Sequence, residues 1–125
     1  MISYFLLLCI YAKADFEVDN FTYHIIDQEK NDVQVVKCTI SSESSLIIPS
    51  TVFYESTNYK VTSIAANAFS SQFEKIYFPY TLIEIDGSAF SWFDHLQSIG
   101  FINENNELIN DTLPPKMTKI NEKVF

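Results

Sequence analysis

The sequence predicts a mainly β or α+β fold in which repeated units stack into a right-handed, curved solenoid with a parallel strand ladder. Three observations in its 125 residues lead to this prediction. A motif that ends in Ala-Phe or Val-Phe recurs along the chain, and a strand-like motif of alternating apolar residues recurs beside it. Two β-patterned runs around a polar turn precede both motifs and predict an N-terminal hairpin.

The two N-terminal runs are Phe21–Ile26 and Val33–Ile40, and the polar turn between them is Asp27–Asp32. The first unit of a solenoid would expose an apolar face if nothing covered it. We therefore expect the hairpin to act as a cap on the first repeat.

The first repeated motif reads x-x-Ile-x-x-x-(Ala/Val)-Phe, and its copies are Thr62–Phe69, Ile83–Phe90 and Thr118–Phe125. Their terminal phenylalanines are separated by 21 and then 35 residues. A recurrence at this spacing is typical of stacked repeats, in which each unit buries its apolar side against its neighbours. We expect the recurrent rings to fill the core, namely Phe69, Phe73, Phe78, Phe90 and Phe101.

The second motif predicts strands at Leu46–Ile48, Ile76–Phe78 and Ile99–Phe101, which should lie side by side. Phe73-x-x-Ile76-x-Phe78 is matched by Leu96-x-x-Ile99-x-Phe101, the L-x-x-L-x-L pattern of a leucine-rich-repeat strand. Since side chains alternate between the two faces of a strand, Ile76 and Ile99 should enter one core. Lys75 and Tyr77 should then face solvent.

Two insertions interrupt the period. Thr51–Tyr54 and Tyr59–Val61 are β-rich and flank the polar residues Glu55–Asn58, which predicts a hairpin that protrudes from the first unit. The segment Ile102–Leu113 is rich in Asn and is either a surface loop or a degenerate half-repeat.

The stretch from Ile48-Pro49-Ser50 to Ala68-Phe69, with its later Phe-Pro and Ala-Phe copies, resembles the BspA-like leucine-rich repeats. The resemblance covers Leu46 to Phe125. It implies short strands, each followed by a tight turn or helical piece, in bacterial or protist surface proteins implicated in adhesion. Repeats of that family usually place Gly and Cys after Ala-Phe, where this chain has Trp92-Phe93. We expect Phe93 to take the core position and Trp92 to be the more exposed ring.

The expected domain organisation is a signal peptide at 1–14, the N-terminal β-hairpin cap at 15–45, and about two and a half leucine-rich-repeat units at 46–125. Ile2–Ala12 is apolar but too short to span a bilayer, and Ala12-Lys13-Ala14 fits a signal-peptidase site. No Lys or Arg precedes the apolar run, so a signal anchor and a buried strand remain alternatives. The repeat pattern stops within a unit, which predicts a truncated array with an unpaired strand edge near Phe101.

Composition and motifs argue against catalysis, cofactors and nucleic acid. The chain has eight Lys, no Arg and sixteen acidic residues, so it lacks the clustered cations that phosphate binding requires. His24 and His95 fall on different predicted elements and no catalytic motif is present. The acidic run Asp15-x-Glu17-x-Asp19 lacks the Gly and Glu of a calcium loop, and we interpret it as solvated.

Cys38 would be the only thiol of a mature chain, because cleavage after Ala14 removes Cys9. It could react or pair between chains, but its expected place on the same strand face as Val36 and Ile40 favours a small buried apolar role.

We hypothesise a binding module for adhesion or protein recognition, whose partner is a protein or glycan on another cell or in the matrix. The candidate contact residues are Lys75, Tyr77, Tyr80 and Trp92. Asn20 and Asn110 begin N-x-Ser/Thr sequons and are candidate glycosylation sites if the secretory route is eukaryotic. The alternative is a structural spacer that displays another domain.

The first testable prediction concerns the mature N-terminus. N-terminal sequencing of the secreted or surface-exposed product should read Asp15 as its first residue, because signal peptidase accepts the small residues Ala12 and Ala14. A surface-exposed product that still begins at Met1 would show that the segment is not cleaved.

Overall fold

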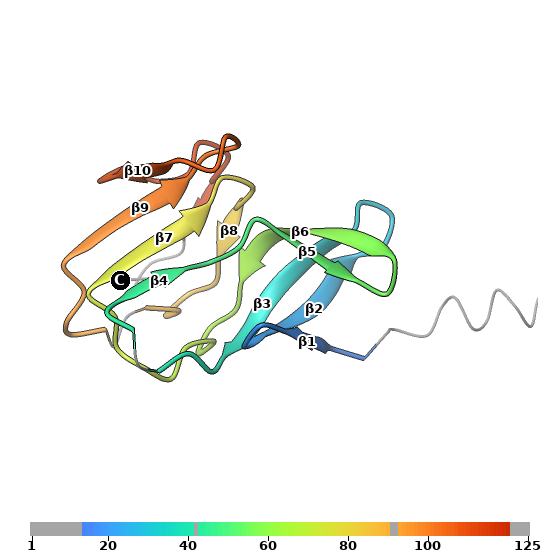
Figure 1. Ribbon diagram of the computed structural model, residues 1–125, viewed down its shortest axis with the longest axis horizontal. Helices are drawn as coiled ribbons and strands as arrows, with labels where there is room; N and C mark the ends of the chain where they lie inside the picture. The colour runs from blue at the N-terminus through green and yellow to red at the C-terminus, as the bar shows by residue number, and fades with distance from the viewer. Residues whose placement is uncertain (1–13, 42, 91–92, 121–125) are drawn as a thin grey trace, which may run out of the picture.

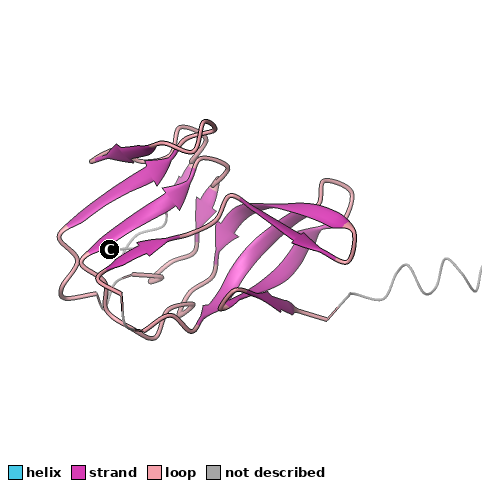
Figure 2. Cartoon of the chain, viewed as in Figure 1, coloured by secondary structure: helices cyan, strands magenta, loops and turns pink. Residues whose placement is uncertain are grey.

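The computed structural model describes residues 14–41, 43–90 and 93–120. Within these ranges it contains strands and no helix, so the fold is mainly β and the α+β alternative is wrong (Figure 2). The expected signal peptide, Trp92 and most of the third Ala/Val-Phe copy lie outside the described residues. The strands are β1 Phe16–Val18, β2 Phe21–Asp27, β3 Asp32–Cys38, β4 Ser45–Ile47, β5 Thr51–Tyr54, β6 Thr57–Ile64, β7 Lys75–Pro79, β8 Glu84–Ile85, β9 Ser98–Ile102, β10 Leu108–Asn110 and β11 Lys119–Ile120.

The strands form two sheets that enclose one apolar core (Figure 1). One sheet has seven strands in the order β1-β2-β3-β6-β8-β11, with β5 also paired to β6. The other has four strands in the order β10-β9-β7-β4. Each repeat contributes one strand to each sheet, since the chain passes from β4 to β6, from β7 to β8 and from β9 to β11.

The predicted strand ladder is confirmed. β4, β7 and β9 are parallel neighbours, and the pairs Leu46 with Ile76 and Ile76 with Ile99 bring equivalent repeat positions together. The side chain of Ile76 is fully buried, and that of Ile99 packs against the same core. The isoleucines of the other motif form a second parallel ladder, in which Ile64 pairs with Ile85 and Ile85 with Ile120. A single isoleucine in a polar stretch gave no strand signal, so this ladder was not predicted.

The N-terminal hairpin is also confirmed as a hairpin, because β2 and β3 pair antiparallel. β1 adds a third strand through a turn in which Asp19 and Asn20 both have positive φ, as hairpins with two-residue turns require. β3 then pairs parallel to β6 and thereby extends the ladder of the repeats.

The expected face of Cys38 is wrong in detail. A register shift between β2 and β3 leaves Val36 without a partner, since Tyr23 pairs with Val35 and Thr22 with Lys37. A bulge of this kind moves every later side chain to the opposite face. Cys38 is buried together with Val33 and Val35, whereas Val36 is only half-buried.

The first insertion forms the predicted hairpin of β5 and β6. Its turn is shorter than expected and consists of Glu55 and Ser56, with φ of 47° and 65°. The hairpin packs over the N-terminal strands, where Tyr54 stacks on Phe16 with 4.3 Å between ring centroids. This contact ties the insertion to the start of the chain.

The second insertion is neither a loop alone nor a half-repeat. Its C-terminal part is β10, which pairs antiparallel with β9 through Ile109 and Phe101. The strand edge near Phe101, which was expected to be unpaired, is therefore covered, and that expectation is wrong. The edge strand is now β10, which has only three residues, and a short edge strand is a usual device for limiting pairing with another chain.

The repeated phenylalanines form the core as predicted. Phe90 is at its centre, stacked on Phe69 at 5.1 Å and in edge contact with Phe93 at 5.3 Å and Phe78 at 5.6 Å. Phe93 is buried, as expected for the position that the related repeats give to Cys. Phe69 belongs to the unit before that of Phe78 and Phe90, so the ring packing couples one repeat to the next.

Removal of the central ring should therefore be costly. We predict that Phe90→Ala lowers the free energy of unfolding by about 3–5 kcal/mol, the usual range for deletion of a buried aromatic ring. Urea unfolding monitored by circular dichroism measures the change. The exposed Phe53, 63% accessible, is the matched control, and Phe53→Ala should cost far less. Equal losses in the two variants would contradict the packing described above.

Candidate functional site

The candidate site is the outer face of the four-stranded sheet, to which each of the four strands contributes alternate residues. Leu46, Ile76 and Phe101 point into the core. The next residue along each strand, or the one before it, therefore lies on the outer face. Across the strands, Tyr77 pairs with both Ile47 and Gly100, and Gly100 pairs in turn with Asn110. These four residues form one row on the outer face, which we call the Tyr77 row.

Tyr77 does not project into solvent, and the expectation that it does is wrong. Its side chain belongs to the outer face, yet the residue is only 7% exposed. The ring lies along the sheet over Gly100, and its hydroxyl donates a hydrogen bond to Asn110 Oδ1 at 2.9 Å. Alternation of side chains gives the face on which a ring lies, but only the cross-strand neighbours decide whether it stands up or lies flat.

Gly100 makes this arrangement possible. A Cβ atom there would come within 3.1 Å of two Tyr77 ring carbons and would collide with the carbonyl oxygen of Ile109. The glycine thus permits both the flat ring and the close approach of β10. The sequence offered a signal for it, since Gly100 is one of only two glycines in the chain and lies within a predicted strand.

The structure divides the predicted contact residues between two places. Lys75 lies beside Tyr77, with its Nζ atom 5.8 Å from the ring centroid. Tyr80 lies past the end of β7, in a hollow of about 340 Å³ lined also by Phe101, Asn103, Glu104, Pro115 and Lys116. Lys116 Nζ is 5.8 Å from the Tyr80 centroid. Each tyrosine therefore has its own lysine, and the two pairs are separate.

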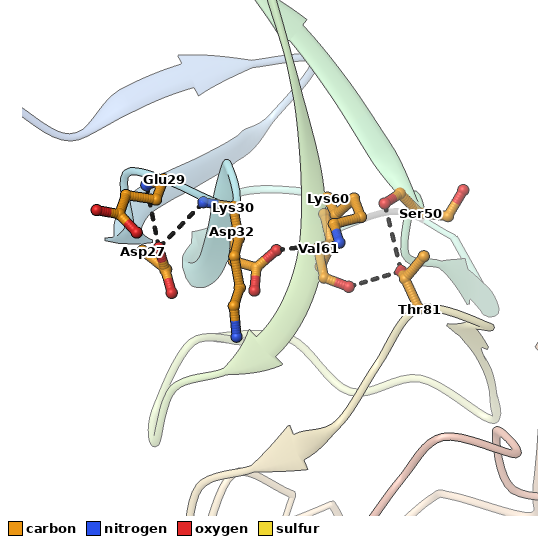
Figure 3. A network of polar contacts seen from close by, with 8 residues as sticks. All are labelled: Asp27, Glu29, Lys30, Asp32, Ser50, Lys60, Val61 and Thr81. Atoms are coloured by element: carbon orange, nitrogen blue, oxygen red, sulfur yellow. Dashed lines mark hydrogen bonds and ion pairs between the residues drawn. The ribbon is translucent and has the colours of Figure 1, made fainter.

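Polar contacts near the N-terminal hairpin hold loops in place (Figure 3). Asp27 Oδ1 accepts backbone hydrogen bonds from Glu29 and Lys30 at 3.0 Å, which fixes the β2–β3 turn. Thr81 Oγ1 donates to the carbonyl oxygens of Val61 at 2.6 Å and Ser50 at 3.3 Å. Asp32 Oδ1 is 3.5 Å from Lys60 Nζ.

Two groups with shifted pKa values are buried. Burial raises the pKa of the Cys38 thiol, and burial with the nearby Asp19 carboxylate raises the pKa of the Tyr23 hydroxyl above its ordinary range. A raised pKa lowers the thiolate fraction at neutral pH, and the thiolate is the reactive form. Cys38 is therefore an apolar core residue, as predicted.

The acidic N-terminal residues do not converge on a metal site. Asp15 Oδ1 instead lies 2.8 Å from His24 Nδ1, and both side chains are 45% exposed. Within the part of the chain that the structure describes, no three metal-ligating side chains cluster. The described residues also include no helix that could cross a membrane.

The two candidate glycosylation sites differ in their surroundings. Asn20 is exposed in the β1–β2 turn, where its Oδ1 accepts a hydrogen bond from Thr39 Oγ1 at 3.2 Å. Asn110 is exposed on β10, where its Oδ1 accepts from Tyr77. In both residues the amide oxygen is engaged in a hydrogen bond with a hydroxyl.

The second structural prediction concerns Gly100. Gly100→Ala should lower the free energy of unfolding by about 1–3 kcal/mol, the usual cost of forcing an extra carbon into a packed site. It should also speed hydrogen exchange of the β10 amides, because the new methyl group displaces that strand. Gly87→Ala is the control, since Gly87 has no positive φ and lies outside the Tyr77 row. Unchanged exchange in β10 would contradict the steric role of Gly100.

No family model matches the chain, and no curated protein matches it. Among the solved structures that are similar, three are described. A leucine-rich cell surface protein from Faecalibacterium prausnitzii A2-165 matches with a TM-score of 0.64 at 19% identity, over 78% of this chain and 25% of that one. A leucine-rich-repeat protein from Bacteroides capillosus ATCC 29799 matches with a TM-score of 0.62 at 20% identity, over 71% of this chain and 66% of that one.

The third is a leucine-rich-repeat protein from Bacteroides ovatus ATCC 8483, with a TM-score of 0.61 at 26% identity, over 83% of this chain and 24% of that one. The chain thus spans about a quarter of the length of two of these proteins and about two thirds of the other. The fold of this chain is that of the bacterial leucine-rich-repeat proteins, and the chain resembles their cell-surface members, as its BspA-like motifs predict.

Proposed function

We propose that this chain is a recognition module, secreted or displayed at a cell surface, that binds a protein or glycan of another cell or of the matrix. The binding surface would be the outer face of the β4–β7–β9–β10 sheet. One of the similar structures is a cell surface protein, and this supports the proposed location. In this proposal the N-terminal hairpin caps the first repeat, and the repeats stack into a curved solenoid.

The observation that carries the proposal is the fixed position of Tyr77. Only 7% of Tyr77 is exposed, so the ring acts as the rigid base of the surface, and a surface that is ordered before binding loses little entropy when a partner contacts it. The Asn110 hydrogen bond and Gly100 hold the ring before any partner arrives. Lys75 adds a cation at one end of the ring.

Two exposed apolar side chains extend the surface, one from Ile47 within the Tyr77 row and one from Leu108 on β10. Ile47 is 49% exposed and Leu108 is 50% exposed. Among the described residues no helix covers this sheet. An apolar surface with a polar border is the usual composition of a protein interface.

The alternative is a structural spacer that displays another domain. The similar proteins support this alternative, because the match to this chain covers only about a quarter of the length of two of them. In those two proteins, this fold is therefore one part of a longer chain. The spacer function predicts that substitutions on the outer face leave every binding activity unchanged. The two functions are thus separated by experiment.

The test is a pair of charge reversals. In surface plasmon resonance against immobilised matrix proteins and mucin-type glycans, Lys75→Glu should weaken binding at least tenfold, because it reverses the charge beside the Tyr77 ring. Lys37→Glu is the matched control, since Lys37 is an exposed strand lysine of the other sheet. Equal effects of the two variants, or no binding by the unaltered chain, would favour the spacer.

A further inference from the structure

The two sheets do not end at the same level at the N-terminal end of the fold. The larger sheet continues beyond β6 with β3, β2 and β1, whereas β4 is the last strand of the smaller sheet (Figure 1). β5 follows β4 in the chain and pairs only with β6 among the described strands. β4 and β5 thus form a strand edge, interrupted by Pro49, which we call the β4–β5 edge.

The hydrogen bonds already made show which backbone groups this edge leaves free. Val61 N–H donates to the Ser50 carbonyl at 2.9 Å, so alternation directs Val52 and Tyr54 toward β6 as well. The backbone N–H and C=O groups of Thr51 and Phe53 then point away from β6. After β4, Ile48 N–H donates to the Tyr77 carbonyl at 3.0 Å. By the same alternation, the backbone N–H and C=O groups of Ile47 point away from β7.

A groove of about 440 Å³ lies along these outward-facing residues. Its lining is mainly apolar and comes from both sheets: Val18, Asp19, Phe21, Tyr23, Ile47, Pro49, Thr51, Val52 and Phe53. Ile47 is 49% exposed and Phe53 is 63% exposed, the largest exposure of any large apolar residue described. Free backbone groups beside an apolar groove are the requirements for adding an extended strand.

The charges around the groove indicate the kind of strand that fits. Asp19 is the charged residue in the lining, and Asp15 and Glu17 flank the buried Phe16 at the start of β1. Lys60, the cross-strand partner of Thr51, has its ammonium group 3.5 Å from Asp32. The whole chain carries a formal charge of −8, so a second copy would be repelled, whereas a basic segment would be attracted.

We propose that the β4–β5 edge accepts an extended segment of a partner protein in which apolar and basic residues alternate. The segment would bond to the backbone of Thr51 and Phe53 and place its apolar side chains in the groove, with its basic ones near Asp19. This inference rests on the recognition role proposed above but assigns a second surface, which shares Ile47 with the Tyr77 row. It therefore adds a partner class to that role.

The experiment uses the full chain and two fluorescein-labelled seven-residue peptides, one alternating valine with lysine and the other valine with glutamate. Fluorescence anisotropy should show binding of the lysine peptide only. Thr51→Pro should weaken it at least tenfold, because proline removes an edge N–H while the bonds to β6 remain. Leu108→Pro, on β10 at the opposite edge of the smaller sheet from β4, is the matched control and should bind the lysine peptide as the unaltered chain does.

Two further variants keep the test informative if proline disturbs folding. Phe53→Ser removes the most exposed ring of the groove, and Asp19→Asn removes its charge while asparagine still tolerates the positive φ of 50°. Both should weaken the lysine peptide severalfold, and added salt should diminish the effect of Asp19→Asn.

Several results would overturn the inference. These are absence of lysine-peptide binding, equal binding of the glutamate peptide, equal binding by Thr51→Pro and Phe53→Ser, or a dimer in sedimentation that Thr51→Pro abolishes. The last result would identify a second copy as the occupant. If matrix binding depends on Lys75 while the peptide fails to bind, the proposed function stands and only this inference fails. If the peptide binds at the β4–β5 edge and no matrix binding is found, this inference stands and the proposed function of the Tyr77 row fails.

Discussion

The packing of phenylalanine rings between two parallel ladders is the interaction on which the rest of the structure depends. A short strand of two or three residues cannot be stable alone, and β4, β8 and β11 are all of this length. They are supported by a core in which Phe90 contacts Phe69 of the preceding repeat at 5.1 Å and Phe78 of its own repeat at 5.6 Å. Because Phe78 lies on β7 of the smaller sheet and Phe90 follows β8 of the larger one, this packing connects successive units and both sheets. This is the one-dimensional stability expected of stacked repeats.

A sheet built from stacked repeats has an edge strand on each side, and in this chain the two sides of the smaller sheet differ. At one side of the smaller sheet β10 folds back on β9, and the Tyr77 hydroxyl reaches across to Asn110 on that strand. At the other side the larger sheet gains the N-terminal strands, while the β4–β5 edge has no partner among the described strands. The insertions that interrupt the repeat period are therefore the elements that decide which edges are protected. They also decide where a partner chain has backbone groups to bind.

The two proposed binding surfaces use different physical means. The Tyr77 row is pre-ordered, with its ring held by Asn110 and by the space over Gly100, so its contribution to binding is a fixed shape. The β4–β5 edge offers unpaired backbone groups and an apolar groove, with Asp19 as an acidic neighbour. Main-chain bonding gives affinity for any extended segment, and the groove and charge provide selectivity. A repeat protein with both surfaces has one rigid contact and one that depends on the partner's conformation.

The sequence by itself determined the repeats, the β4–β7–β9 ladder, both early hairpins and the identity of the core rings. These follow from local patterns, because periodic apolar residues must face one interior wherever the strands lie. Only the tertiary structure decided the second ladder through Ile64 and Ile85, the return of β10 and the orientation of Tyr77. It also decided the face of Cys38, which depends on a bulge at Val36. Such features arise where distant strands meet, and cross-strand register and neighbouring side chains leave no trace in a single stretch of sequence.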